Sequence, residues 1–226
     1  MAAVEGVQAP AGVLEREREL GGLRALLDDA RAGRGRLLAV EAPPGMGKTT
    51  LLAHAAAAAA QDGLQVLRAT GRELERELGW GVARSLFEPW LLGRPAGERE
   101  ALLAGPAAGA RPLLVAEFDA AAPAGPDGAF ALLHGLYWLT VRAAERRPLV
   151  LVVDDLQWAD EPSLRFLLYL AGRVQDHPVA LLVAARSGEA GAGGRLPLLL
   201  SAPPRPATAS TRPAPPSGRP ARWRGS

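Results

Sequence analysis

A glycine- and proline-rich loop between two apolar runs constrains this chain more than any other feature. The run RLLAVEA (36–42) lacks helical spacing and predicts a buried strand. The loop PPGMGKTT (43–50) follows, and residues 49–61 are rich in alanine and end at Asp62-Gly63, which predicts a helix. A loop that leads from a strand into a helix is suited to anions, because the first N–H groups of a helix have no partner within it.

The loop matches the phosphate-binding (P-loop) pattern G-x-x-x-x-G-K-S/T, except that Ala42 stands in place of the first glycine. Pro43 and Pro44 lack an N–H group, but the phosphates are expected to contact the later amides of the loop. Ala42 can leave the strand if the turn keeps its φ negative. The predicted nucleotide-binding residues of the loop are Gly45, Met46, Gly47, Lys48, Thr49 and Thr50.

Lysine usage supports a specific role for the loop. The chain has 25 arginines and one lysine, Lys48, and it contains no Asn or Ile. We expect Lys48 to reach the β- and γ-phosphates as a catalytic residue and the Thr49 hydroxyl to ligate Mg²⁺. The alternative is a glycine-proline turn with one solvated lysine. Guanine-reading loops commonly use an Asn-Lys-x-Asp segment, which this chain cannot form, so ATP is the predicted nucleotide.

A second motif is LVLVVDD (149–155), an apolar strand that ends in two acids. Such a strand places carboxylates at the C-terminal edge of the sheet, where open α/β sheets bind ligands. Asp154 is predicted to hold Mg²⁺, and Asp155 is predicted to orient or deprotonate the attacking water. The alternative, two acids that cap a turn, is weakened by the P-loop upstream.

Further residues are less specific. Arg186 follows the last predicted strand, and its side chain could reach the γ-phosphate as a catalytic cation, although a solvated arginine explains it too. Arg16 could lie near the nucleotide base, but a charged helix face explains it nearly as well. Gln157 and Trp158 could either touch the site or brace it. The three histidines show no metal-ligand spacing.

Hydrophobic periodicity places the remaining elements. Helices are predicted at 14–31, at 71–92 around Leu74, Leu78, Val82 and Leu86, at 130–146, and after Asp160 as N-cap. Strands are predicted at 64–70, 149–153 and 178–185, and residues 93–127 are predicted to be mostly loop with a short helix near 98–104. Alternating strands and helices predict an α/β fold with a mainly parallel sheet.

Composition limits the cellular setting. The chain contains no cysteine and no apolar run long enough to span a bilayer, so we expect a cytoplasmic protein without a membrane partner. Residues 1–13 are predicted to be a disordered leader, 14–188 a folded domain and 189–226 a disordered Pro/Arg-rich tail. The tail is either natural or the product of a frameshift or truncation, and we favour the second. Its six arginines from residue 195 onward account for the basic pI of 9.6.

Together these motifs resemble a known family. LEREREL, GMGKTTLL, WGVARSLFEPWL and LVLVVDDLQWADEPSLRFLLYLA resemble the AAA-type ATPase domain of large ATP-binding LuxR-family transcriptional regulators, within the STAND class of signalling NTPases. The resemblance implies a P-loop NTPase three-layer sandwich and a switch that ATP, ADP and Mg²⁺ control. It also implies self-association or contacts with regulator domains in a full-length relative. Lys48, Thr49, Asp154, Asp155 and Arg186 stand at that family's functional positions.

The chain departs from this family after the fourth strand, where no fifth strand, helical lid, sensor repeats or helix-turn-helix can be recognised. We therefore expect a C-terminally truncated domain of marginal stability that binds nucleotide, hydrolyses it slowly at best and does not itself bind DNA. One alternative is a non-functional remnant of such a regulator. The other alternative is a small-molecule kinase, which would need an acceptor pocket and usually an arginine-bearing lid.

Overall fold

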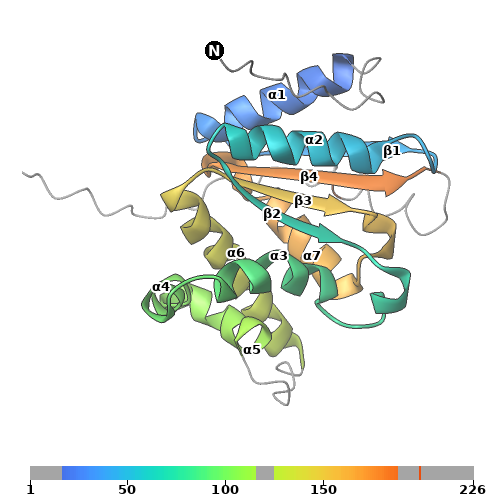
Figure 1. Ribbon diagram of the computed structural model, residues 1–226. Helices are drawn as coiled ribbons and strands as arrows, with labels where there is room; N and C mark the ends of the chain where they lie inside the picture. The colour runs from blue at the N-terminus through green and yellow to red at the C-terminus, as the bar shows by residue number, and fades with distance from the viewer. Residues whose placement is uncertain (1–16, 116–124, 188–198, 200–226) are drawn as a thin grey trace, which may run out of the picture.

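The computed structural model describes residues 17–115, 125–187 and 199, and these form an α/β fold (Figure 1). The strands are β1 (Arg36–Ala42), β2 (Gln65–Thr70), β3 (Leu149–Asp154) and β4 (Val179–Arg186). The α-helices are α1 (Glu17–Arg31), α2 (Lys48–Gln61), α3 (Gly81–Leu92), α4 (Ala96–Leu102), α5 (Arg111–Leu114), α6 (Gly125–Arg146) and α7 (Glu161–Ala171).

The described strands form one parallel sheet in the order β1-β4-β3-β2. The β1–β4 ladder runs as far as the pair Ala42 and Arg186, and the β2–β3 ladder as far as the pair Thr70 and Asp154. Because all four strands are parallel, their C-terminal ends share one edge of the sheet. The ends of β1, β4 and β3 are neighbours there. β1 is the outer strand on its side of this four-stranded sheet, and its residues are exposed or only partly buried, so residues 36–42 form the predicted strand but not a buried one.

The alternation of side chains along β3 divides the core into two layers. Leu149, Leu151 and Val153 face one cluster of buried residues, whereas Val150 and Val152 face the other. Since both faces are covered, the strand is buried at every position, as its continuous apolar run predicts. Helices α1 and α2 cover one face of the sheet, and α3, α6 and α7 cover the other (Figure 1). The predicted three-layer sandwich is confirmed.

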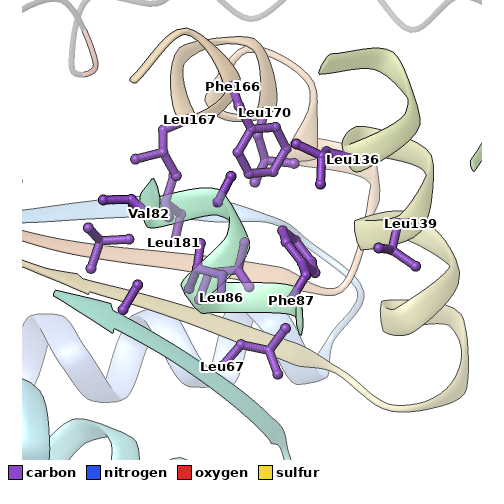
Figure 2. Close-up of a cluster of buried hydrophobic side chains, with 14 of the residues drawn as sticks. Leu67, Val82, Leu86, Phe87, Leu136, Leu139, Phe166, Leu167, Leu170 and Leu181 are labelled. Atoms are coloured by element: carbon purple, nitrogen blue, oxygen red, sulfur yellow. The ribbon is translucent and has the colours of Figure 1, made fainter. Parts of the chain in front are cut away.

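The larger core cluster lies between the sheet and α3, α6 and α7. Figure 2 shows Phe87 of α3 near Phe166 of α7, with Leu136 of α6 beside them. The two phenyl rings meet edge to face, with centroids 5.9 Å apart. All three side chains are fully buried. This packing fixes α7, and with it the connection from the C-terminal end of β3.

The layer on the other face forms as the leucine spacing predicts. Leu23, Leu26 and Leu27 of α1 are buried against α2 and the sheet. The alanines of α2, including Ala55 and Ala59, are buried in the same cluster. Small side chains along α2 let it lie close to the strands. The helix that follows the P-loop is thereby held against the sheet.

The helix predicted over residues 71–92 is wrong in its first half. Residues Glu73–Glu75 form a short 3₁₀ turn, α3 begins only at Gly81, and Leu74 and Leu78 are 94% and 61% exposed. Trp80 precedes α3 with a left-handed φ of 70°, which breaks the helical run. The Trp80 N–H donates to the carboxylate of Asp160, far along the chain, and local periodicity cannot reveal this contact.

The short helix predicted near 98–104 forms as α4, but the loop predicted over most of residues 93–127 is wrong for the rest of its described part. Residues 96–114 fold into α4, a 3₁₀ helix at Gly105–Ala110 and α5. The 3₁₀ helix lies so close to α6 that a Cβ on Gly109 would lie 2.3 Å from the Ala131 oxygen. A Cβ on Gly135 would likewise lie 2.3 Å from the Ala110 nitrogen. The glycine and alanine content therefore reflects close helix packing here rather than a loop.

The predicted leader (1–13) and tail (189–226), including the frameshift interpretation, lie outside the described residues, apart from Leu199. Within the described parts of the chain, no helix is both long enough and apolar enough to cross a bilayer.

Candidate functional site

A cleft lies at the C-terminal edge of the sheet, where the ends of β1, β3 and β4 meet. It has a volume of about 290 Å³. The lining residues come from the loop after β1, the start of α2, and the ends of β3 and β4. They are Pro44, Gly45, Gly47, Lys48, Thr49, Asp155 and Arg186. Two motifs about a hundred residues apart in the sequence thus meet at one cleft.

The loop after β1 depends on two glycines with left-handed backbone. Gly45 has φ 77° and Gly47 has φ 71°, a region that a side chain would strain. Ala42 remains in β1 and is absent from the positive-φ residues, which agrees with the turn predicted for it. No side chain caps α2, whereas α7 is capped by the Asp160 carboxylate, which accepts from the Ser163 N–H. The first amides of α2 are therefore available at the cleft.

Lys48 is the first residue of α2, and its side chain folds back under the loop. The ammonium donates to the carbonyl oxygens of Ala42 at 2.8 Å and Pro43 at 2.9 Å. Lys48 is only 7% exposed, so these carbonyl oxygens take the place of water around its ammonium. Thr49, the next residue, is exposed at the wall of the cleft.

The two acids at the C-terminal end of β3 have different surroundings. Asp154 is 8% exposed, and its Oδ1 accepts the N–H of Asp155 at 2.9 Å. Asp155 lines the cleft and has φ 48° and ψ 47°, a left-handed conformation that is uncommon outside glycine. The backbone around it is tightly packed, because a Cβ on Gly71 would lie 2.4 Å from the Asp155 carbonyl oxygen.

Arg186 and Gln157 complete the arrangement around Asp155. The Arg186 Nε lies 3.7 Å from Asp155 Oδ1. The Gln157 side chain is almost fully buried, at 2% exposed, and its Nε2 donates to the same Oδ1 at 2.7 Å. Sequence reasoning left open whether Gln157 touches the site or braces it. Its contact with Asp155 places it directly behind the cleft.

The structure does not bring every predicted site residue to the cleft. Met46 is 53% exposed and, like Thr50, does not line the cleft. Asp154, unlike Asp155, is not among the residues that line the cleft. Arg16 lies outside the described residues. Pro44 was expected only to occupy a loop position whose N–H group the phosphates do not need, but it also lines the cleft.

The donor set at the cleft fits Mg²⁺ bound together with phosphates. Mg²⁺ prefers oxygen ligands and usually binds proteins through one or two carboxylates, with phosphates and waters completing its shell. The Thr49 hydroxyl and the Asp155 carboxylate supply such oxygens at the wall of the cleft, and Asp154, which does not line it, offers a further carboxylate at the end of β3. Among the described residues, no group of three or more His, Asp or Glu side chains forms a metal site by itself. His134 and His177 instead contact tyrosine hydroxyls.

Comparisons with known proteins agree with this geometry. A family model described as the AAA ATPase domain matches residues 13–183. The chain belongs to the AAA ATPase domain family. Membership of this family indicates a nucleotide-binding P-loop function. A search of curated proteins finds no match.

The search of solved structures finds one with the same fold at low sequence identity, and a second with a weaker likeness. The Aeropyrum pernix ORC2 protein, in its ADPNP-ADP complexes, is similar with a TM-score of 0.50 and 18% identity over 88% of this chain and 48% of that chain. Drosophila ORC bound to GC-rich DNA and Cdc6 has a TM-score of 0.35 and 13% identity over 86% of this chain and 60% of that chain. This AAA ATPase chain spans about half the length of the first structure.

Proposed function

We propose that this AAA ATPase domain binds ATP with Mg²⁺ at the cleft and acts as a nucleotide-controlled switch with slow hydrolysis. The observation that carries the proposal is the convergence of the Lys48 loop, the uncapped start of α2, Asp155 and Arg186 on one cleft. Backbone N–H groups and cations on one side and carboxylates on the other suit a triphosphate with its metal ion.

Each group has a proposed task. The amides from Gly45 to Thr49 bind the phosphates, and the Lys48 ammonium neutralises charge on the β- and γ-phosphates. Thr49 and Asp154 hold Mg²⁺, which neutralises negative charge on the phosphates when it is bound. Arg186, at the end of the adjacent strand, reaches the γ-phosphate, so its position depends on whether that phosphate is present.

Asp155 is proposed to orient or deprotonate the attacking water. It is the acid that lines the cleft, and two neighbours hold its Oδ1. A carboxylate whose position is fixed loses less freedom when it orients a water molecule.

The biological setting is proposed from the sequence resemblance. DDLQWADEPS at residues 154–163 supports a place among STAND-class, LuxR-family regulators, in which nucleotide state would control domain contacts or self-association. On this proposal residues 14–188 are the switch domain. Target genes would be read by other parts of such a regulator rather than by this domain.

Fluorescent ATP titration with and without Mg²⁺ tests the proposal. The wild-type chain is expected to bind in a Mg²⁺-dependent manner, and Lys48→Ala is expected to weaken binding by about 100-fold, in line with the loss of a charge-assisted contact. Arg165→Ala, on the exposed side of α7, is the matched control for loss of a cation and should bind normally. Absence of binding by the folded wild-type chain would instead indicate a non-functional remnant.

A further inference from the structure

We propose that Gln157 is a positioning residue for hydrolysis, whose carboxamide holds the Asp155 carboxylate through one end and the last residue of β4 through the other. The inference rests on the proposed function, because it assigns Asp155 to the attacking water. Its basis is a pair of hydrogen bonds from one buried side chain. Nε2 donates to Asp155 Oδ1 at 2.7 Å, and Oε1 accepts the Arg186 backbone N–H at 3.1 Å.

The Arg186 N–H needs an acceptor because β3 ends before β4 does. The β3–β4 ladder stops at the pair Val153 and Val183, whereas β4 continues beside β1 as far as Arg186. The next N–H, of Ser187, donates to Ala42 on β1. Successive N–H groups of a strand point to opposite sides, so the Arg186 N–H faces the side that β3 has left. There the Gln157 Oε1 accepts the hydrogen bond that a β3 carbonyl oxygen would otherwise accept.

The chemistry of the two partners requires an amide at residue 157. A carboxylate oxygen can only accept and a backbone N–H can only donate, so the bridging group must donate at one end and accept at the other. This requirement also fixes the orientation of the Gln157 carboxamide. Glutamate has nearly the same shape, but an ionised glutamate cannot donate to Asp155. Leucine can neither donate nor accept.

Asp155 depends on such support because its backbone is strained. A non-glycine residue in the left-handed region persists only where its surroundings over-determine it. Here the Asp155 N–H donates to Asp154, its carbonyl oxygen lies against Gly71, and its side chain accepts from Gln157. Because Gln157 donates to Oδ1 of Asp155, the carboxylate cannot rotate freely. Its second oxygen, Oδ2, is then held in one position, where it can accept a hydrogen bond from water. The same amide fixes Arg186 to Asp155 across the strand ends.

Two substitutions separate the two ends of the amide. Gln157→Glu keeps the acceptor for Arg186 but loses the donor to Asp155, whereas Gln157→Leu loses both. Gln65→Leu is the matched control, because Gln65 is a partly buried amide at the opposite end of the sheet that accepts from Arg94. Single-turnover and steady-state hydrolysis of Mg·ATP would be measured on the full chain, with fluorescent ATP binding and thermal unfolding in parallel.

Both Gln157 variants are expected to lower kcat by about 10-fold or more, a fraction of what a positioned base contributes, while KM and nucleotide affinity stay within about threefold. Gln65→Leu should leave kcat unchanged. A Gln157→Glu variant that turns over at the wild-type rate would overturn the proposal, since only the strand-end contact would then matter. Equal losses of binding and turnover would also overturn it and indicate a structural role.

The failure of the inference can be distinguished from the failure of the proposed function. If the wild-type chain binds Mg·ATP but hydrolyses none in a single turnover, the roles of Asp155 and Gln157 are overturned while nucleotide binding stands. If the wild-type chain does not bind nucleotide, the proposed function fails, and the positioning role fails with it.

Discussion

Arg186 and Asp155 lie at the ends of adjacent strands with the Nε of one 3.7 Å from the Oδ1 of the other. The separation is longer than a hydrogen bond, so the contact is mainly electrostatic. Both side chains are about one-third exposed at the cleft, at 35% and 30%. The pair therefore places a cation and an anion side by side where we propose that phosphate and water meet.

The first prediction concerns the Asp155 charge. Asp155→Asn keeps the size of the side chain but removes a group able to accept a proton, so hydrolysis is expected to fall by about 100-fold or more. Binding of Mg·ATP should change by less than about threefold, because the proposed phosphate contacts come from the P-loop. Single-turnover hydrolysis and fluorescent ATP titration measure the two quantities. Asp127→Asn, an exposed change at the start of α6, is the control. Equal turnover by Asp155→Asn and wild type would contradict the assignment.

The cleft residues could be predicted where one short segment contains both the functional side chains and the apolar run that defines the end of a strand. G-K-T after an apolar strand placed Lys48 and Thr49 at the wall of the cleft, and the apolar run before Asp155 placed that acid at the same edge of the sheet. In both segments the local pattern defines the strand end. The parallel sheet then brings the strand ends together without further information from the sequence.

The parts that could not be predicted depend on contacts between distant segments. Leu74, Leu78, Val82 and Leu86 have true helical spacing, yet only the last two are buried. The helix begins at Gly81 because side chains from the start of α7 accept its first N–H groups. The role of Gln157 has the same origin, since its second partner lies 29 residues later on β4.

The second prediction concerns Asp160, which caps two helices at once. Its carboxylate is 1% exposed and accepts the N–H groups of Trp80 at 2.7 Å, Val82 at 3.2 Å and Ser163 at 2.8 Å. Asp160→Ala would leave these donors without acceptors and should lower the free energy of unfolding by about 2–4 kcal/mol. Urea unfolding measures the change.

Ser163→Ala provides a graded comparison for Asp160. The Ser163 hydroxyl accepts only the Ala83 N–H, at 3.0 Å, so its loss should cost about 1 kcal/mol. If Asp160→Ala costs no more than Ser163→Ala, the double-capping interpretation is wrong.

The third prediction concerns the close contact behind Asp155. A Cβ on Gly71 would lie 2.4 Å from the Asp155 carbonyl oxygen, so Gly71→Ala must displace the backbone after β3. We expect a loss of about 1–3 kcal/mol in the free energy of unfolding, together with slower ATP hydrolysis. Gly21→Ala is the matched control, because nothing lies within 4 Å of its Cβ in α1 and alanine favours a helix interior by about 0.5–1 kcal/mol. Similar stabilities for the two variants would refute the predicted clash.

The fourth prediction concerns pH and His177, which precedes β4 and contacts the Tyr137 hydroxyl at 3.1 Å. Burial lowers the pKa of His177, and the nearby Asp176 and Glu145 carboxylates only partly oppose this shift. The unfolded chain, with a histidine pKa of about 6.5, then binds more protons than the folded chain. Stability should therefore fall as the pH drops through about 6.5 and level off below the folded pKa.

His177→Phe isolates this contribution, because it keeps an aromatic ring against Tyr137 of α6 but does not titrate. Urea unfolding of both chains between about pH 8 and pH 5 avoids most carboxylate titration, and His54 and His134 are common to both chains. The wild-type free energy of unfolding should fall more steeply toward acid than that of the variant. Parallel pH profiles would show that His177 is equally easy to protonate in the folded and unfolded chains, against the effect of its burial.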